Sequence, residues 1–332
     1  MEQKGNGRTI LKVSGLKTYF FTSEGVTKAV DGVDFEINRG EVLGVVGESG
    51  CGKSVTALSI LRLVASPPGR IVDGRIEFMK RDLRTLSDYE IRKIRGKMIS
   101  MIFQDPLTCL NPVLRIGYQI SEVFRFHKSL DRVKSLVESI RMLKSTEIPS
   151  PEERVKNYPH EMSGGMRQRA MIAMALACEP ALLIADEPTT ALDVTVQAQV
   201  LKLMKELCRE RETAMLLITH DMGVVAKMCQ RVAVMYAGRV VEYTDVYTLF
   251  GRPAHPYTEA LLRSLPRLGT KRNRLDSIEG QPPQLNRLPP GCAFEPRCKY
   301  LSERCREEAP ELRDLSEGHE VRCYYPINGG EK

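Results

Sequence analysis

The octapeptide GESGCGKS at residues 47–54 joins an apolar run to a helical run and contains three glycines, a lysine and a serine hydroxyl. It matches the spacing G-x-x-x-x-G-K-[ST], in which glycines let backbone N–H groups turn inward around phosphate oxygens. The positive end of the following helix dipole adds to this attraction. The pattern therefore predicts a nucleotide phosphate site, against the plainer alternative of a glycine-rich turn with a surface lysine. Its residues would be Gly47, Glu48, Ser49, Gly50, Cys51, Gly52, Lys53 and Ser54.

Within this loop, Lys53 would reach the β- and γ-phosphates and the Ser54 hydroxyl would ligate Mg²⁺. The run ALLIADE ends in two acids, Asp186 and Glu187. Asp186 would orient the metal, and Glu187 could polarise an attacking water as a general base. A solvated turn is the alternative for the acids. The run LLITHD places His220 after another apolar strand, and parallel strands gather chemistry at their carboxyl ends.

A second candidate anion site lies in HEMSGGMRQRA, where Ser163, Gly164 and Gly165 directly precede a helix. A helix N-terminus of this kind attracts negative charge. One nucleotide is already accounted for by the loop at 47–54, so this segment is hard to explain within a single subunit. A capping serine followed by a glycine hinge is the alternative.

The elements that must position these residues follow from the apolar pattern. Short strands are expected over 8–46, then strand, loop and helix over 42–65, and helix and strand alternate after 163. A hairpin is expected around Ala237-Gly238. Continuous apolar strands alternating with helices predict an α/β core with a mainly parallel sheet.

A helical insert is expected within this core from about 105 to 162. Its apolar residues recur near a 3.6-residue period and predict one apolar face. These residues are Leu130, Val133, Leu136, Val137, Ile140 and Leu143.

The composition is that of an ordinary globular protein: 332 residues, 42% hydrophobic and 27% charged. The net charge of +7 is weak support for a nucleic-acid partner and leaves a lipid headgroup surface open. The N-terminus lacks a signal peptide's apolar core, and no run reaches the roughly 18 apolar residues of a membrane span. We therefore expect a cytoplasmic protein that partners could hold at a membrane.

Beyond Gly251 the composition shifts, which indicates a separate extension. Prolines cluster there, and Cys292, Cys298, Cys305 and Cys323 follow at spacings x5, x6 and x17. Four thiolates suit an iron–sulfur cluster or zinc. Short C-x2–4-C pairs typical of zinc sites are missing, and free or disulfide-bonded thiols are the third possibility. In a zinc site, His319 could replace one cysteine, but a surface histidine is the preferred interpretation.

Six segments resemble, in order and spacing, the nucleotide-binding subunit of an ABC transporter: GESGCGKS, FQD, MSGGMRQR, LLIADEP, TTALDVT and LITHD. The resemblance implies an ABC-type P-loop NTPase domain over 1–250. It would carry an antiparallel β subdomain and a helical subdomain at about 105–165. A small cysteine-rich extension would occupy 251–332.

The resemblance also implies roles and cofactors, with ATP and Mg²⁺ bound between two subunits paired head to tail. The serine-glycine segment would clamp the nucleotide in trans, and Asp193 would lie across the dimer seam. Gln104 would sense Mg²⁺ and the attacking water and link to the membrane partner, while His220 would hold the γ-phosphate. Phe20 would stack on adenine, with Tyr19 as second choice.

One residue departs from the family pattern. Met166 stands where the serine-glycine motif commonly ends in glutamine, and it lacks an amide's hydrogen bonds. The Ser163 hydroxyl and the helix N-terminus remain, so ATP binding is still expected.

The string from NYPHEMSGG to VQAQVL and the segment HPYTEALLRSLP at 255–266 look like the oligopeptide and dipeptide importer branch. This implies two permease subunits, a second ATPase subunit (preferably a different chain), and an extracytoplasmic peptide-binding protein, with no nucleic acid. The subunit would lie at the cytoplasmic face of the membrane. In this branch the tail cysteines accompany a 4Fe-4S cluster, and zinc is the runner-up. A structural or regulatory role is expected for such a cluster, because the sequence shows no electron acceptor site.

Three alternatives remain for function. Nickel importers share much of this branch. A soluble ABC ATPase serving nucleic acid or ribosomes commonly has two cassettes or a long coiled coil, which this chain lacks. A metabolite kinase leaves the serine-glycine segment unexplained. The basic string RLGTKRNR at 267–274 could meet acidic lipids, although a solvated linker is preferred.

Overall fold

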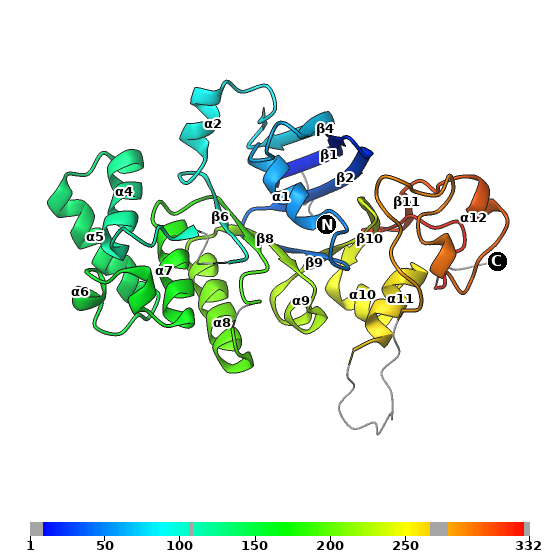
Figure 1. Ribbon diagram of the computed structural model, residues 1–332. Helices are drawn as coiled ribbons and strands as arrows, with labels where there is room; N and C mark the ends of the chain where they lie inside the picture. Colours follow the sequence, from blue (N-terminus) through cyan, green and yellow to red (C-terminus); the bar gives the residue numbers. More distant parts are fainter. Residues whose placement is uncertain (1–8, 106–108, 191, 266–277, 329–332) are drawn as a thin grey trace, which may run out of the picture. The chain divides into compact units, whose positions relative to one another are not determined.

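The computed structural model describes residues 9–105, 109–190, 192–265 and 278–328 (Figure 1). These form two compact units, and each is described by itself. The first unit comprises the described residues before 11 together with 37–42 and 79–218; the second comprises 11–36, 43–78 and the described residues from 219 onward. No helix in the described ranges is long and apolar enough to cross a membrane. The basic string at 267–274 lies outside the described residues.

The first unit contains three neighbouring parallel strands, β6 (Ile99–Ile102), β7 (Leu182–Asp186) and β8 (Ala214–Thr219). Every residue of β7 and β8 is buried, as expected for strands covered on both faces. The register pairs Ile102 with Ala185, so the polar residues that follow β6 and β7 leave the sheet at one edge. Its other described elements are β5 (Arg81–Asp82), α2 (Asp88–Ile94), α6 (Pro151–Arg154), the 3-10 helix η1 (Pro159–Glu161) and α8 (Val194–Glu210).

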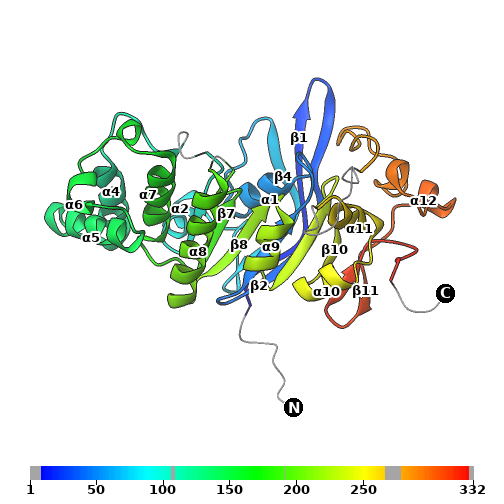
Figure 2. The ribbon, with the colours of Figure 1, turned by 90° about the horizontal axis from the view of Figure 1, so that it is seen from below.

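The helical insert is present as α4 (Ile116–Lys128) and α5 (Arg132–Ser145), which contact each other and the helix that follows, α7 (Gly164–Leu176) (Figures 1 and 2). The apolar face predicted for this segment is wrong in part, because only its Leu143 is buried within α5. Three of its members are exposed, and the helix instead buries a face with two serines. The exposed residues are Val133, Leu136 and Val137, and the buried ones are Ser135, Ser139, Met142 and Leu143.

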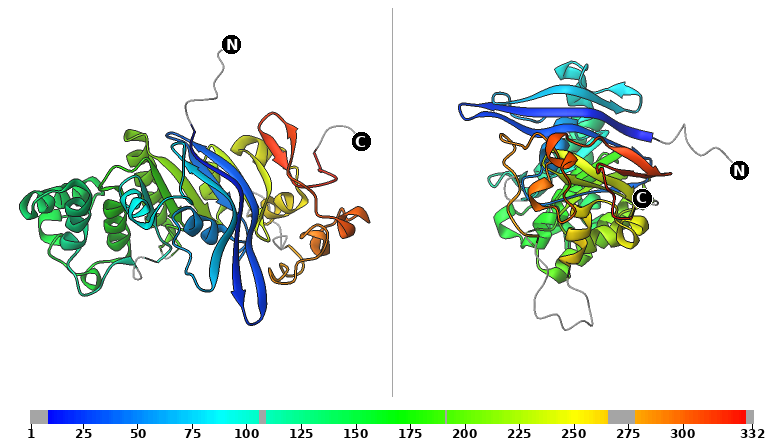
Figure 3. Two further views of the ribbon diagram at one scale, coloured as in Figure 1. Left: turned by 90° about the horizontal axis from the view of Figure 1, so that it is seen from above. Right: turned by 90° about the vertical axis from the view of Figure 1, so that its right-hand side faces the viewer.

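In the second unit, β1 (Thr9–Thr22) lies between β2 (Gly25–Asn38) and β4 (Gly69–Phe78), and Figure 3 shows these long strands in blue. β1 and β4 are antiparallel. A second set of strands runs in the order β11-β12-β10-β9-β3. Here β3 (Val42–Val46) is parallel to β9 (Arg231–Tyr236), and β9 forms the expected hairpin with β10 (Arg239–Asp245). The parallel strands expected from the sequence are confirmed in the pairs β3–β9, β6–β7 and β7–β8.

The remaining described elements of this unit are α1 (Lys53–Ile60), α9 (Met222–Met228), α10 (Val246–Gly251), α11 (Pro256–Arg263), the 3-10 helix η2 (Glu295–Arg297), α12 (Arg304–Glu307), β11 (Arg313–Ser316) and β12 (His319–Val321).

Residues beyond 250 pack into the core of the second unit. Tyr257 and Phe294 share one buried cluster with Val46 and Tyr236. His319, expected at the surface, is buried, and its Nε2 lies 2.9 Å from Oε1 of Glu242 on β10. A domain boundary at residue 250 stays a prediction.

The predicted iron–sulfur site at Cys292, Cys298, Cys305 and Cys323 is wrong, and so is its zinc alternative. Among the described residues, no group of three or more His, Cys, Asp or Glu side chains could hold a metal ion, and all four thiols are free. They border a cavity of only about 20 Å³, which is room for about one water. Burial also raises the pKa of Cys292 and Cys298, and that of Cys323 to about 12, which opposes the thiolate form that metals require.

Candidate functional site

The glycine loop of the second unit connects β3 to α1. Gly47, Gly50 and Gly52 have φ values of +154°, +78° and +104°, a region that L side chains rarely adopt. A Cβ at Gly47 would overlap the carbonyl oxygen of Met235, and one at Gly52 would overlap that of Ala29. Glycine is therefore required at both positions by shape as well as by backbone conformation.

The loop presents the donors that a phosphate group needs. Gly52 is the N-cap of α1, and among the described residues no side chain caps this N-terminus. The first amides of α1 therefore keep the character of an anion site. Lys53 is buried and its Nζ donates to the carbonyls of Gly47 and Glu48 at 2.8 and 2.9 Å, while Ser54 is exposed. These residues fit a bound triphosphate.

The two candidate aromatic residues lie on opposite faces of β1, as neighbours in a strand do. Tyr19 donates from its hydroxyl to Asp31 at 2.6 Å, and burial and this carboxylate raise its pKa. Phe20 shares a face with Thr18, whose hydroxyl lies 2.8 Å from that of Ser59 on α1. The face of β1 that meets the helix after the phosphate loop is thus the face of Phe20, which favours Phe20 over Tyr19.

In the first unit, the side chains predicted for hydrolysis meet at the carboxyl ends of β6 and β7. Asp186 is buried as the last residue of β7, and Glu187 follows with a φ of +46°. Nε2 of Gln104 and Oγ1 of Thr190 both donate to Oε2 of Glu187, at 3.2 and 3.0 Å. A left-handed φ in a non-glycine residue costs about 1–3 kcal/mol and is often found where side-chain direction matters.

The serine-glycine segment and Asp193 begin helices of the same unit. Ser163 is the exposed N-cap of α7 and accepts the Met166 N–H at 3.2 Å. A Cβ at Gly165 would come 2.9 Å from Cγ1 of Val196 on α8. Asp193 caps α8, accepting from two backbone amides, and is exposed. Met166 thus contributes its backbone N–H to the cap at Ser163.

His220 directly follows β8 and is exposed in the second unit. The structure thus groups Gln104 with Glu187 in one unit. It groups the phosphate loop and Phe20 in the other.

Sequence reasoning missed several residues that touch predicted site residues, among them Thr190, Tyr257 and Arg297. Thr190 lies only three residues after Glu187, so a contact between the two side chains could have been expected from their spacing in the sequence. Tyr257 and Arg297 both bind Glu48 of the phosphate loop, from 209 and 249 residues away. Tyr257 lies in HPYTEALLRSLP, a segment that was singled out only for its resemblance to the oligopeptide and dipeptide importer branch.

Comparisons with known proteins show what this chain is similar to. Residues 30–190 match the family described as ABC transporter, and residues 241–305 match the oligopeptide/dipeptide transporter C-terminal region. A probable peptide ABC transporter ATP-binding protein of Sinorhizobium fredii is 51% identical over 98% of this chain and 97% of its own length. An oligopeptide transport ATP-binding protein of Bacillus subtilis is 50% identical, covering 98% and 99%. One of Escherichia coli is 49% identical, covering 96% and 94%.

Solved structures extend the likeness to the fold. The ATP-binding cassette MJ0796, solved as a dimer in a post-hydrolysis state bound to ADP and Pi, is 26% identical with a TM-score of 0.64. The match covers 71% of this chain and 99% of that one. A cbiO1 protein from Clostridium perfringens, part of a cbiONQ complex, has a TM-score of 0.62 at 30% identity, covering 73% and 91%. The expected cassette fold is confirmed.

Proposed function

The chain belongs to the ABC transporter family as an ATP-binding subunit of the oligopeptide/dipeptide importer type, and from this premise we propose which of its residues bind and hydrolyse ATP. Hydrolysis of ATP drives the transport. Gly47 to Ser54 hold the phosphates through backbone amides and Lys53, and Phe20 stacks on adenine. Ser54, Gln104 and Asp186 would hold Mg²⁺, which would supply positive charge that neutralises the phosphate oxygens.

Glu187 acts as the general base that takes a proton from the attacking water. The observation that carries this proposal is the pair of donors on one carboxylate oxygen. Because Gln104 and Thr190 both bind Oε2, the plane of the Glu187 carboxylate is fixed before any substrate arrives. A general base must lie within hydrogen-bond reach of its water, and a fixed carboxylate meets that need at no further cost in entropy. His220 stabilises the γ-phosphate.

The nucleotide is closed off by a second ATPase subunit. Ser163 caps a helix at the exposed start of α7, as a group that binds the γ-phosphate of a partner in trans requires. Asp193 lies across the same seam, again exposed. The dimeric ADP-bound cassette that this chain resembles supports such a pair. We propose a different ATPase chain as the partner.

The remaining partners follow from the importer type. Two permease subunits carry the peptide across the membrane, and a peptide-binding protein delivers it on the other side. This subunit works at the cytoplasmic face. The sheet β2-β1-β4 and the helices α4, α5 and α7 serve as the antiparallel and helical subdomains of the cassette.

The test replaces Glu187 by glutamine, which keeps the shape and removes the basic oxygen. Glu187→Gln should bind Mg-ATP with unchanged affinity, hydrolyse it about 10²–10⁴-fold more slowly, and form a stable nucleotide-dependent dimer with its ATPase partner. Glu179→Gln is the matched control, because Glu179 is an exposed carboxylate at the opposite end of β7. Normal turnover in Glu187→Gln would rule out Glu187 as the base.

A further inference from the structure

Glu48, the second residue of the phosphate loop, is bound through all three of its polar groups. Its carbonyl accepts from Nζ of Lys53 at 2.9 Å, within the loop. Its backbone N–H donates to the Tyr257 hydroxyl at 2.9 Å. Its carboxylate accepts from Nη1 and Nη2 of Arg297 at 2.6 and 2.9 Å. Two of the three partners therefore come from the chain beyond residue 250.

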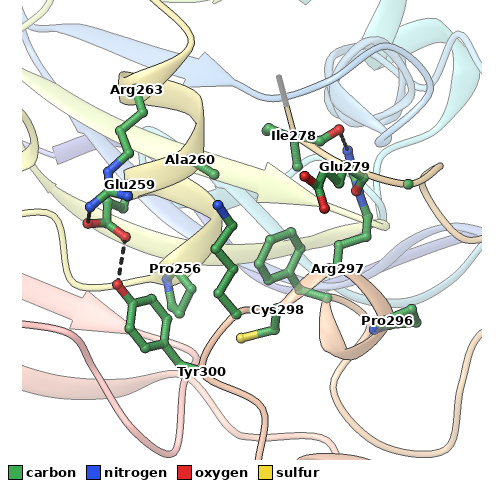
Figure 4. Close-up of a pocket in the computed structure, with 13 residues that line it drawn as sticks. Pro256, Glu259, Ala260, Arg263, Ile278, Glu279, Pro296, Arg297, Cys298 and Tyr300 are labelled. Atoms are coloured by element: carbon green, nitrogen blue, oxygen red, sulfur yellow. Dashed lines mark hydrogen bonds and ion pairs between the residues drawn. The ribbon is translucent and has the colours of Figure 1, made fainter. Parts of the chain in front are cut away.

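Arg297 is itself held from several directions. Its side chain is only 3% exposed, and its Nε donates to the Glu279 carbonyl at 3.0 Å (Figure 4). Further donations reach the Ile278 carbonyl at 3.4 Å and the Tyr236 hydroxyl at 3.3 Å. A bidentate arginine–carboxylate pair fixes direction as well as distance. Since the guanidinium cannot swing away, the carboxylate of Glu48 has one place to lie.

Tyr257 is equally fixed. Its ring is fully buried, with its centroid 4.6 Å from that of Tyr236 and 5.5 Å from that of Phe294. Its backbone N–H donates to Nδ1 of His255 at 3.0 Å, and the His255 N–H donates to the buried carboxylate of Glu242 at 2.8 Å. The hydroxyl that meets the loop is thus anchored through α11 to strand β10.

We propose that Tyr257 and Arg297 are positioning residues for nucleotide binding, which hold the phosphate loop in its binding conformation through Glu48. The inference rests on the proposed role of the loop at 47–54 and extends it to the C-terminal part of the chain. A flexible loop loses conformational entropy when it binds ATP. A loop that is already held in place at Glu48 loses less entropy, so it binds ATP more tightly. The C-terminal segment therefore contributes to ATP affinity without touching ATP.

The choice of variants follows from the surroundings of Arg297. It lines a cavity of about 280 Å³, so truncation to alanine would enlarge the cavity as well as break the pair (Figure 4). Arg297→Gln removes the charge with less loss of volume. Arg263→Gln is the matched control, because Arg263 lines the same cavity and pairs with Glu259 at 2.6 Å. Among the described residues, Arg263 pairs with Glu259 and makes no hydrogen bond or ion pair with the phosphate loop.

The experiment measures equilibrium binding of Mg-ATP to the full chain, together with the urea midpoint of unfolding. Arg297→Gln should raise the Kd for Mg-ATP about tenfold, and Tyr257→Phe, which removes one oxygen atom, about threefold or more. Arg263→Gln should leave the Kd unchanged. In the double variant Glu48→Gln with Arg297→Gln, the Kd should rise no more than in the single variant with the larger Kd. The reason is that both substitutions remove the same interaction, the pair between Glu48 and Arg297.

The following outcomes decide the inference. If Arg297→Gln and Tyr257→Phe lower only the urea midpoint and keep the wild-type Kd, the contacts are merely structural and the inference is wrong. If Arg297→Gln fails to fold, the Kd of Tyr257→Phe decides in the same way. Lys53→Ala separates the inference from its premise. Loss of ATP binding in Lys53→Ala, with normal binding in the other two, overturns the inference alone, while normal binding in Lys53→Ala overturns the role of the loop.

Discussion

Two glycines of the phosphate loop, two residues apart, should respond very differently to the same substitution. Gly50 has a φ of +78° with nothing within 4 Å of an added Cβ. Gly52 has a φ of +104°, and its added Cβ would overlap the backbone carbonyl of Ala29. Alanine at either position incurs backbone strain, but only at Gly52 must a neighbouring backbone also move.

The magnitudes follow from these two terms. Gly50→Ala should destabilise the protein by about 1–2 kcal/mol, the usual cost of placing an L-residue in a left-handed conformation. Gly52→Ala adds the cost of overpacking against a backbone atom, about 1–3 kcal/mol, for a total of about 2–5 kcal/mol. Moving Gly52 also displaces the N-cap of α1 and hence the amides proposed to bind phosphate.

The assay measures the urea midpoint of unfolding for both variants and the wild type. Mg-ATP binding is then measured without urea, where each protein is folded. The midpoint should fall further for Gly52→Ala than for Gly50→Ala, and only Gly52→Ala should lose at least tenfold in ATP affinity. Equal midpoints and equal affinities for the two variants would refute the reasoning, because they would show that the contact with Ala29 does not constrain the loop.

Two further predictions concern buried charge. Asp31→Asn should destabilise the protein by about 3 kcal/mol in urea unfolding, because Asp31 is 6% exposed and pairs with Arg239 at 2.6 Å while accepting from Tyr19. Asp73→Asn, which breaks an exposed pair, should cost under about 0.5 kcal/mol, and equal losses would contradict this ranking. Burial lowers the pKa of His255 to about 4, so the unfolded chain binds a proton between about pH 6.5 and 4 that the folded chain does not. The unfolding free energy should therefore fall by about 2 kcal/mol from pH 7 to pH 5, a loss that His255→Gln should largely abolish and whose persistence in that variant would assign it to other groups.

Local sequence patterns predicted the parts of the site that depend on neighbours in the chain. The glycine spacing at 47–54 requires left-handed φ values, and the structure has them at Gly50 and Gly52. Ser163 and Asp193 each precede a helical run and each caps the helix that follows. Such features depend on residues within about one helical turn of each other in the sequence, so they can be predicted from the order of the residues alone.

Features that depend on which surfaces meet were not predictable in this way. On α5 the 3.6-residue period identified an apolar stripe, but it could not say which side faces α4 and α7. The buried side carries Ser135 and Ser139, and the Ser139 hydroxyl donates within its own helix at 2.7 Å, so these small polar groups can be buried. The four late cysteines show the same limit. Their number suggested a metal site, but a metal site requires that the thiols point toward one another around a space large enough for the metal.

Glu48 combines a feature that local sequence determines, the phosphate loop, with contacts from distant parts of the chain. The motif at 47–54 fixes Gly47, Gly52, Lys53 and Ser54 by the chemistry of phosphate binding, and it leaves positions 48–51 open to any residue. At an open position, another part of the chain can bind the loop without replacing a residue that the nucleotide requires. Glutamate there offers a carboxylate to Arg297, and its amide meets Tyr257. Glu48, at one of the variable positions of the motif, is therefore where the C-terminal part of this chain acts on ATP binding.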